Sequence, residues 1–356
     1  MKYWPKIFKR WQQMFSTDLG IDLGTANTLV YLKDHGIVIN EPTVVAINEK
    51  TGQIVAIGSD AKQMVGRTPA HVTVIRPLVD GVISNFEVTE EMLAYFIRKA
   101  CQISTKKFLR PRVVIGVPSG ITNVEIRAVR DAARNAGAGA VYIVEEPIAA
   151  AIGIRLSIHE PVGNMIVDIG GGTTDIAVIS LGGIVRSKNL RIAGDRLNSD
   201  IIAYMRDEFK ILLGEKTAEE VKVAIGAVYR QKELKDATIR GRDLVTGLPK
   251  EVVITDADIK EAISTSIEQL VDSVKEVLES TPPEIISDIM HKGIVLAGGS
   301  ALLQGMRELL ERELKIPIYL ADDPLTAVVR GTGIILEDLE RYQNILLDDK
   351  NDIPPK

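Results

Sequence analysis

Two short glycine-containing segments of closely similar sequence lie in opposite halves of this 356-residue chain. The first is Asp22-Leu23-Gly24-Thr25-Ala26-Asn27-Thr28, and the second is Asp168-Ile169-Gly170-Gly171-Gly172-Thr173-Thr174-Asp175. An apolar run precedes and follows each segment, which predicts the tight turn of a β-hairpin with an aspartate at the end of the incoming strand. Small residues at such a turn leave backbone N–H groups open to a phosphate oxygen, and aspartate supplies a hard oxygen for Mg²⁺. One turn is weak evidence, but two indicate a nucleotide held between two related domains.

The order of the predicted elements repeats as well. In each half, strands around the glycine-containing turn come first and helices follow, which predicts two related α/β domains. Helices are expected at 59–65, 88–104, 123–136, 148–156, 197–213, 218–225, 256–278 and 302–314. We assign residues 17–45, 79–153 and 326–347 to domain IA, 46–78 to an inserted subdomain IB, 154–189 and 253–325 to domain IIA, and 190–252 to an inserted subdomain IIB. The polar, proline-containing tail 348–356 is expected to be frayed.

Composition narrows the possible functions. A net charge of −5 gives no support to a nucleic-acid-binding body, so no nucleic-acid partner is expected. The longest uncharged stretch, residues 293–306, is shorter than the roughly 18 residues that span a bilayer. Cys101 is the single cysteine, which excludes an intramolecular disulfide and favours a reducing compartment. A nucleophilic role for Cys101 is possible, but the helical pattern around it favours a buried helix position.

The first 16 residues differ from the rest of the chain because they carry four basic residues and no acidic one. Their apolar residues recur at helical spacing, which predicts an amphipathic helix that lies on a membrane surface without spanning it. A helix packed on the body of the protein is the alternative. Basic residues interrupt the apolar run, which argues against a signal peptide. The apolar face consists of Trp4, Ile7, Phe8, Trp11, Met14 and Phe15.

Three further segments complete a recognisable pattern. They are Glu145-Glu146-Pro147-Ile148-Ala149-Ala150, Leu296-Ala297-Gly298-Gly299-Ser300-Ala301, and Asp322-Asp323-Pro324-Leu325-Thr326-Ala327 followed by Gly331-Thr332-Gly333. Together with the two turns, they resemble in order the five motifs of the actin-like ATPase superfamily. Asn40-Glu41-Pro42 and Ile192-Ala193-Gly194-Asp195 extend the resemblance to the MreB family of bacterial actins, over residues 18–339. The resemblance implies an actin-like (ribonuclease H-like) α/β fold, with two related domains around a nucleotide cleft and a smaller subdomain inserted in each.

The resemblance also implies ATP and Mg²⁺ as ligands and assigns roles to the matching residues. Asp22 and Asp168 would hold Mg²⁺ through its waters. Glu146 would orient the attacking water, with Glu145 as the alternative, and Thr173 or Thr174 would supply a hydroxyl. Phosphate-binding amides are expected at Gly24, Thr25, Ala26, Asn27, Gly170, Gly171, Gly172 and Thr173.

The remaining implied contacts concern the nucleoside. Gly298, Gly299, Ser300 and Ala301 would lie against the adenine or ribose, where larger side chains would clash. Glu219, Glu220, Val221 and Lys222 match a family helix near the nucleoside, although a solvated helix face is the alternative for its charged residues. Asp195 is assigned a structural role in its turn.

The implied function is slow ATP hydrolysis coupled to the assembly of filaments, which in this family are often paired antiparallel. The filaments would lie on the inner face of the cytoplasmic membrane and organise cell-wall elongation with the rod-shape proteins. Phe108 and Leu109, flanked by basic residues, would insert into anionic lipid, or else pack into the core.

Three other functions remain as alternatives. A sugar or acetate kinase would need a larger substrate subdomain than residues 46–78 provide. A chaperone would need a substrate-binding domain after the ATPase. A scaffold that binds ATP without hydrolysing it is disfavoured by Glu146.

Overall fold

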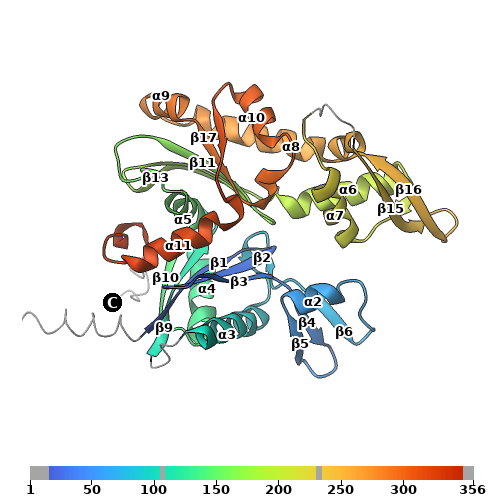
Figure 1. Cartoon of the computed structure of the whole chain (residues 1–356), viewed down its shortest axis with the longest axis horizontal. Helices are drawn as coiled ribbons and strands as arrows, with labels where there is room; N and C mark the ends of the chain where they lie inside the picture. The colour runs from blue at the N-terminus through green and yellow to red at the C-terminus, as the bar shows by residue number, and fades with distance from the viewer. Residues whose placement is uncertain (1–15, 105–108, 230–234, 348–356) are drawn as a thin grey trace, which may run out of the picture. The chain divides into compact units, whose positions relative to one another are not determined.

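The computed structural model describes residues 16–104, 109–229 and 235–347. The chain divides into two compact units: unit 1 comprises the residues up to Leu156 and from Thr326 onward, and unit 2 comprises residues 157–325. Each unit contains a five-stranded mixed sheet (Figure 1). In both sheets three consecutive strands form an antiparallel meander, and the first of them also pairs in parallel with a strand from later in the chain. The repeated pairing pattern confirms the prediction of two related α/β domains.

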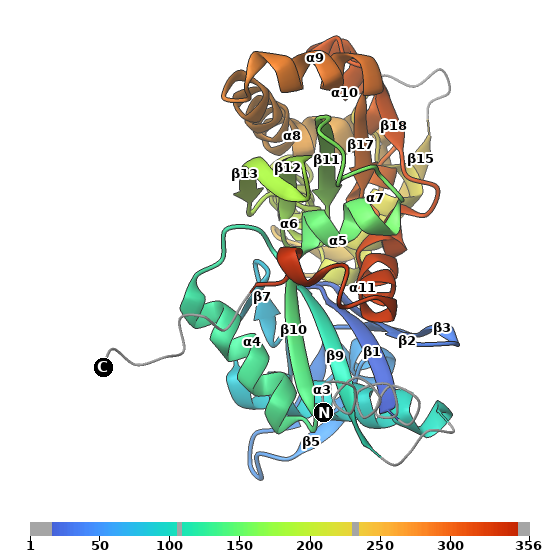
Figure 2. The same ribbon diagram turned by 90° about the vertical axis from the view of Figure 1, so that its left-hand side faces the viewer.

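The sheet of unit 1 has the strand order β10-β9-β1-β2-β3 and carries helices on both faces (Figure 2). Its strands are β1 (Ser16–Leu23), β2 (Asn27–Leu32), β3 (Gly36–Pro42), β9 (Leu109–Val117) and β10 (Ala140–Glu145). Its helices are α3 (Phe86–Ile103), α4 (Asn123–Asn135), α5 (Glu146–Gly153) and α11 (Ala327–Glu337). Leu19 and Ile21 of β1 are fully buried in one core with residues of α3 and α4. Gly20 lies between them and faces α11, because successive strand residues point to opposite faces.

A small subdomain is inserted into unit 1 between β3 and α3. It is a three-stranded sheet of order β5-β4-β6 with one short helix. Its elements are β4 (Val45–Asn48), β5 (Ile54–Ile57), α2 (Ser59–Met64) and β6 (Val72–Ile75), and the short hairpin β7 (Leu78–Val79) and β8 (Val82–Ile83) returns the chain to α3. Glu41 at the end of β3 links this subdomain to the sheet, because its carboxylate accepts hydrogen bonds from the Ser59 amide at 2.8 Å and from Lys99 Nζ at 2.6 Å.

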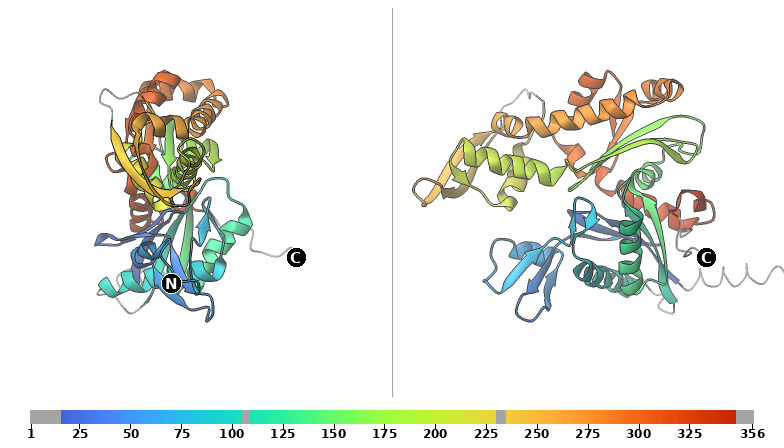
Figure 3. Two further views of the ribbon diagram at one scale, coloured as in Figure 1. Left: turned by 90° about the vertical axis from the view of Figure 1, so that its right-hand side faces the viewer. Right: turned by 180° about the vertical axis from the view of Figure 1, so that it is seen from behind.

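The sheet of unit 2 has the order β13-β12-β11-β17-β18, and all six residues of its central strand β11 are buried. Its strands are β11 (Asn164–Ile169), β12 (Thr174–Ser180), β13 (Gly183–Leu190), β17 (Ile294–Ala297) and β18 (Ile318–Leu320). A second, three-stranded sheet contains β14 (Ile211–Leu212), β15 (Asp236–Asp243) and β16 (Pro249–Thr255). The helices are α6 (Gly194–Asp207), α7 (Glu215–Ile225), α8 (Asp256–Glu279), α9 (Pro283–Lys292) and α10 (Met306–Leu314), with 3₁₀ turns at Gly299–Leu302 and Pro324–Thr326. The long helix α8 runs from the β15–β16 hairpin to the five-stranded sheet (Figure 3).

Local sequence explains where several helices begin. Thr122 and Glu125 form a capping box at the start of α4, and Thr255 and Asp258 form one at the start of α8. In each box the threonine hydroxyl accepts from a backbone amide of the first turn while the carboxylate accepts from the threonine amide. These side chains therefore satisfy backbone donors that the helix itself leaves without a partner.

One helix prediction was wrong at its end, and two helices were not predicted. The helix expected at 197–213 ends at Asp207, and the chain then enters β14. Helix α9 was not predicted because Pro282 and Pro283 were interpreted only as a stop, whereas proline is also compatible with a first helical turn. Helix α11 was not predicted because it contains two glycines. One of them, Gly331, packs so closely on α5 that a Cβ would lie 1.8 Å from the Ala149 carbonyl oxygen.

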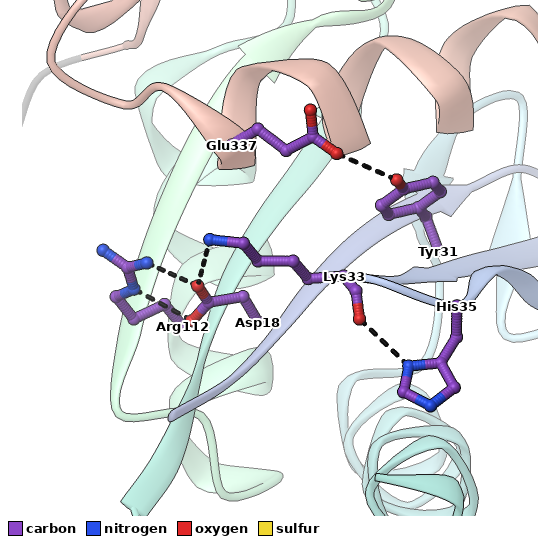
Figure 4. A network of polar contacts seen from close by, with 6 residues as sticks. All are labelled: Asp18, Tyr31, Lys33, His35, Arg112 and Glu337. Atoms are coloured by element: carbon purple, nitrogen blue, oxygen red, sulfur yellow. Dashed lines mark hydrogen bonds and ion pairs between the residues drawn. The ribbon is translucent and has the colours of Figure 1, made fainter. Parts of the chain in front are cut away.

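An ion-pair network around the buried Asp18 lies at the end of the unit 1 sheet where β1 begins (Figure 4). The Arg112 guanidinium donates two hydrogen bonds to the buried carboxylate of Asp18, from Nε to Oδ1 at 2.9 Å and from Nη2 to Oδ2. Lys33 Nζ lies 3.8 Å from Asp18 Oδ2.

Within the described ranges, no helix is both long and apolar enough to cross a membrane.

Candidate functional site

The first glycine-containing segment is the turn of the β1–β2 hairpin, as predicted. The carbonyl oxygens of the turn point into the protein: Gly24 O accepts from Thr43 Oγ1 at 2.6 Å, and Ala26 O accepts from the Thr43 amide at 2.9 Å. Within the described part of the chain, the amides of Thr25 and Ala26 donate to no acceptor. The turn therefore presents backbone donors, which is the property that binds phosphate.

The shape of this turn depends on glycine at its first position. A Cβ on Gly24 would lie 2.6 Å from the carbonyl oxygen of Asn27, which is a backbone atom and cannot rotate away. The Thr25 hydroxyl accepts from the Gly81 amide at 3.0 Å, so its side chain also ties the turn to the protein.

The second segment is the turn of the β11–β12 hairpin and repeats this arrangement in unit 2. Gly170 O accepts from Ser300 Oγ at 2.8 Å and from the Gly194 amide at 3.2 Å. Gly171 O accepts from the Asp195 amide at 2.8 Å, which supports the structural role assigned to that residue. The amides of Gly171 and Gly172 donate to no acceptor among the residues that the structure describes. The two related domains thus carry two related donor loops.

An aspartate lies at the strand end before each loop. Asp22 is half-buried at the end of β1, and desolvation raises the pKa of its carboxyl to about 7. Asp168 is 8% exposed, and a Cβ on Gly298 would lie 2.5 Å from its Oδ1. No cluster of three or more His, Cys, Asp or Glu side chains exists in the described residues. Each loop thus offers one carboxylate, which fits Mg²⁺, because this ion keeps most of its waters and takes few protein ligands.

Glu146 begins helix α5 directly after β10, with Pro147 in the first turn. Its Cγ lies 3.4 Å from the position of a Cβ on Gly116, and Gly116 pairs with Asp22 in the β1–β9 register. The strand ends of β1, β9 and β10 therefore bring Glu146 to the same edge of the sheet as Asp22. Glu145 is the last residue of β10 and precedes the helix.

The two candidate threonines lie in different environments. Thr174 is fully buried, and its hydroxyl donates to the Ile192 carbonyl oxygen at 2.6 Å. That hydrogen bond leaves the Thr174 hydroxyl unavailable to a ligand. Thr173 lies in the loop itself and is 7% exposed, which favours Thr173 over Thr174 as the candidate for the hydroxyl role.

The segment 298–301 follows β17 and is held close to the second loop. Gly298 adopts a φ of 83°, and its amide donates to the Pro324 carbonyl oxygen at 2.9 Å. Ser300 contacts the loop itself through the hydrogen bond to Gly170 described above. Ala301 is buried beside Gly299, which begins the 3₁₀ turn.

The residues expected near the nucleoside on α7 differ in their surroundings. Lys222 is buried, and its Nζ donates to the Gly194 carbonyl oxygen at 2.7 Å, so the alternative of a solvated side chain is wrong for this residue. Glu220 is exposed and pairs with Lys216 at 3.8 Å. Val221 packs its side chain in the core of unit 2, which leaves only its backbone for a ligand, and Glu219 is half-buried.

Sequence reasoning missed Thr43, whose hydroxyl and amide hold the first loop. Thr43 and Thr28 are both fully buried, and their hydroxyl oxygens lie 2.9 Å apart. The only nearby sequence signal was the family segment ending at Pro42. Cys101 lies half-buried in α3, and burial raises the pKa of its thiol, which disfavours a nucleophilic role.

The predicted membrane-binding side chains are not part of the described structure. Trp4, Ile7, Phe8, Trp11, Phe15 and Phe108 lie outside the described residues. Leu109 is the first residue of β9, and its backbone pairs with that of Ser16.

Comparisons with known proteins agree with these motifs. The profile of the MreB/Mbl protein family matches residues 16–344. The cell shape-determining protein Mbl of Bacillus cereus is 48% identical over 92% of this chain and 98% of its own length. The cell shape-determining protein MreB of Escherichia coli is 47% identical over 97% of this chain and 100% of its own length. The crystal structure of Spiroplasma citri MreB5 bound to AMPPNP superimposes with a TM-score of 0.87 at 38% identity, covering 92% of this chain and 98% of that one. The expected actin-like α/β fold is confirmed.

Proposed function

The chain belongs to the MreB/Mbl family, and from that premise we propose that it is a bacterial actin that binds and slowly hydrolyses ATP, assembles into filaments and helps to determine cell shape. The observation that carries this proposal is the pair of hairpin loops, each with its carbonyl oxygens turned inward, unpaired amides and an aspartate at its base. A polyphosphate chain is the ligand that fits such donors. The MreB5 relative was solved with AMPPNP and also with ADP, which supports ATP as the nucleotide.

In this proposal each loop binds phosphate oxygens of a nucleotide. Asp22 and Asp168 would hold Mg²⁺, and the cation would supply charge neutralisation on the phosphates. The loop amides fix the positions of the phosphate oxygens. Gly298 and Gly299 allow the nucleoside to approach the backbone at the end of β17, where a side chain would interfere.

Hydrolysis requires a group that orients water toward the terminal phosphate, and Glu146 is the candidate. It lies at the same sheet edge as Asp22, in the first turn of α5. Thr173 supplies a hydroxyl from the second loop. Phosphoryl transfer depends mainly on positioning and charge stabilisation, so these few groups suffice for slow turnover.

Binding and hydrolysis can be tested separately. Calorimetry should detect Mg²⁺-dependent ATP binding that Asp168→Asn weakens strongly, while the exposed control Asp207→Asn leaves it unchanged. Glu146→Gln should keep ATP binding but lower phosphate release by a factor of about 10²–10³, as expected for loss of a water-positioning group. If Glu145→Gln lowers phosphate release by this factor and Glu146→Gln does not, Glu145 is the residue that orients the water. Wild-type protein that binds ATP but releases no phosphate would favour the scaffold alternative.

Self-assembly into filaments, with antiparallel pairing as the expected arrangement, is proposed from the family. Electron microscopy with Mg-ATP tests this directly. The protein should form filaments with ATP and fewer with ADP. Particles that stay monomeric across nucleotide and salt conditions would contradict the proposal.

A peripheral location on the inner face of the cytoplasmic membrane is also proposed, with cell-wall elongation proteins as further partners. One feature of the sheet supports it: Ser16 pairs with Leu109, so the chain enters β1 and β9 on adjacent strands. The N-terminal segment and the loop that ends at Leu109 are thus attached at the same end of one sheet. Two apolar anchors attached there bind a surface more strongly than either alone.

Liposome co-sedimentation tests the membrane proposal. Trp11→Glu and Phe108→Glu should each reduce binding to anionic vesicles, and together they should abolish it. Neutral vesicles should bind the wild-type protein less well, because the basic residues of both segments then lack a counter-charge. Unchanged binding by the double variant would refute these two anchors.

A further inference from the structure

The two loops share a contact that is made by residues outside the two turn segments themselves. In each loop, the carbonyl oxygen of the first glycine accepts a hydrogen bond from a hydroxyl group elsewhere in the chain. Thr43 Oγ1 donates to Gly24 O at 2.6 Å, and Ser300 Oγ donates to Gly170 O at 2.8 Å. The two hydroxyls come from unrelated positions, 19 residues after the first glycine in one unit and 130 residues after it in the other.

This contact fixes the direction of the amides that would meet phosphate. A trans peptide is planar, so its C=O and N–H point in opposite directions. Holding Gly24 O toward the protein interior therefore turns the Thr25 N–H outward. Holding Gly170 O inward does the same for the Gly171 N–H.

A second peptide in each loop is held by a backbone amide, two residues after Gly24 in the first loop and one residue after Gly170 in the second. The Thr43 amide donates to Ala26 O at 2.9 Å, and the Asp195 amide donates to Gly171 O at 2.8 Å. These are backbone contacts, which a side-chain substitution leaves in place. The two hydroxyls are thus the part of the restraint that mutation can remove.

The hydroxyl at the first loop is strongly constrained. Because the Thr43 hydroxyl donates to Gly24 O, its oxygen is left to accept from Thr28, whose oxygen lies 2.9 Å away. Both threonines are 0% exposed, so water cannot replace either partner. Consecutive hydrogen bonds of this kind polarise and strengthen one another.

We propose that the hydroxyls of Thr43 and Ser300 are a matched pair of positioning groups for phosphate, one for each loop. This inference rests on the proposed nucleotide binding and deepens it. Without the hydroxyl, the carbonyl oxygen of the first glycine loses its shortest hydrogen bond, so the peptide is held less firmly and turns more readily to present that oxygen to the ligand, which repels phosphate. The effect should therefore be specific to the β- and γ-phosphates and should spare the nucleoside. Ser300, expected from sequence to contact adenosine, acts in this proposal on the phosphates through Gly170.

The test compares Mg-ATP with AMP, which lacks the β- and γ-phosphates. Thr43→Val and Ser300→Ala should each weaken Mg-ATP binding about tenfold, the change that corresponds to loss of a hydrogen bond worth about 1.4 kcal/mol. Competition by AMP should be unchanged. Thr43→Ser keeps the hydroxyl and should bind Mg-ATP like the wild type, whereas the double variant should lose about a hundredfold.

Two matched controls remove a similar hydrogen bond away from the loops. The buried Thr89 hydroxyl donates to Asn85 O at 2.7 Å in unit 1, and Ser264 Oγ donates to Glu261 O at 2.9 Å in unit 2. Thr89→Val and Ser264→Ala should leave both nucleotide affinities unchanged.

The outcomes separate this inference from the function on which it rests. Wild-type protein that binds no Mg-ATP would overturn the proposed function and the inference together. Wild-type binding with unchanged affinity in Thr43→Val and Ser300→Ala, or with equal losses for Mg-ATP and AMP, would overturn the inference alone. If Thr43→Val fails to fold, Ser300→Ala still tests the inference. This variant should fold, because Ser300 is half-buried and the Gly194 amide still donates to the Gly170 carbonyl oxygen.

Discussion

Gly298 lies where β17 ends beside the second loop, and its replacement by alanine tests how tightly this part of the protein is packed. Its φ of 83° and ψ of 160° lie in a region that essentially only glycine adopts, which costs an alanine about 1–3 kcal/mol. A Cβ there would also lie 2.3 Å from the Ile169 carbonyl oxygen and 2.5 Å from Asp168 Oδ1. The first contact is with the backbone, so relief requires movement of β11 or β17, and overpacking of this kind costs about 1–3 kcal/mol.

The two contributions together predict that Gly298→Ala lowers the free energy of unfolding by about 2–6 kcal/mol. Gly247 supplies a matched control in the same unit, because its φ is 75° and nothing lies within 4 Å of its Cβ position. Gly247→Ala should therefore show only the backbone contribution of about 1–2 kcal/mol. The extra destabilisation of Gly298→Ala over Gly247→Ala reports the close contacts of Gly298 together with its extended ψ of 160°.

Urea unfolding followed by circular dichroism gives both stabilities, and calorimetry gives Mg-ATP affinity. Gly298→Ala should also bind Mg-ATP more weakly, because the new methyl group displaces the Asp168 carboxylate. Gly247→Ala should bind it normally. Equal stability of the two variants, together with wild-type affinity in Gly298→Ala, would refute the close packing of Gly298 against Asp168.

Three further predictions follow from individual contacts. Asp18→Asn should lower the free energy of unfolding by about 3–5 kcal/mol, because it leaves the half-buried Arg112 guanidinium without its anion. Thermal or urea unfolding measures this change, and a value below about 1 kcal/mol would contradict a stabilising buried ion pair. Hydrogen bonds from the amides of the β15–β16 turn, together with a nearby lysine, lower the pKa of the Asp243 carboxyl to about 2. The ionised carboxylate therefore stabilises the folded protein fully above its pKa in the unfolded chain, about 3.9. This stabilisation is lost as the pH falls toward 2. Asp243→Asn should remove this part of the pH dependence of the free energy of unfolding. An unchanged slope of that free energy between pH 4 and pH 2 would contradict the prediction. Thr174→Val should lower stability by about 1–3 kcal/mol without changing the rate constant of bound-ATP hydrolysis, whereas Thr173→Val should lower that rate constant; the reverse pattern would assign the hydroxyl role to Thr174.

The sequence alone was sufficient for the two hairpins, their aspartates and the repeated strand order. These features depend on local patterns: apolar runs on both sides of a glycine-containing turn, and the alternation of strand residues between two faces. The same patterns gave most helices, but they failed at α9 and α11. Proline and glycine normally disfavour helices. In α9 the prolines lie at the start of the helix, where proline is tolerated, and in α11 a glycine is required by close packing on α5.

The tertiary structure decided which groups complete each loop. Thr43 and Ser300 belong to no shared motif, and chain folding alone brings their hydroxyls to equivalent carbonyl oxygens. It also separated Thr173 from Thr174, which are adjacent in sequence but differ in whether a hydroxyl is already bonded to the backbone. A turn motif is local, so its residues are visible in the sequence. The hydrogen-bond partners that hold it in one conformation are non-local, and only the packed fold determines which they are.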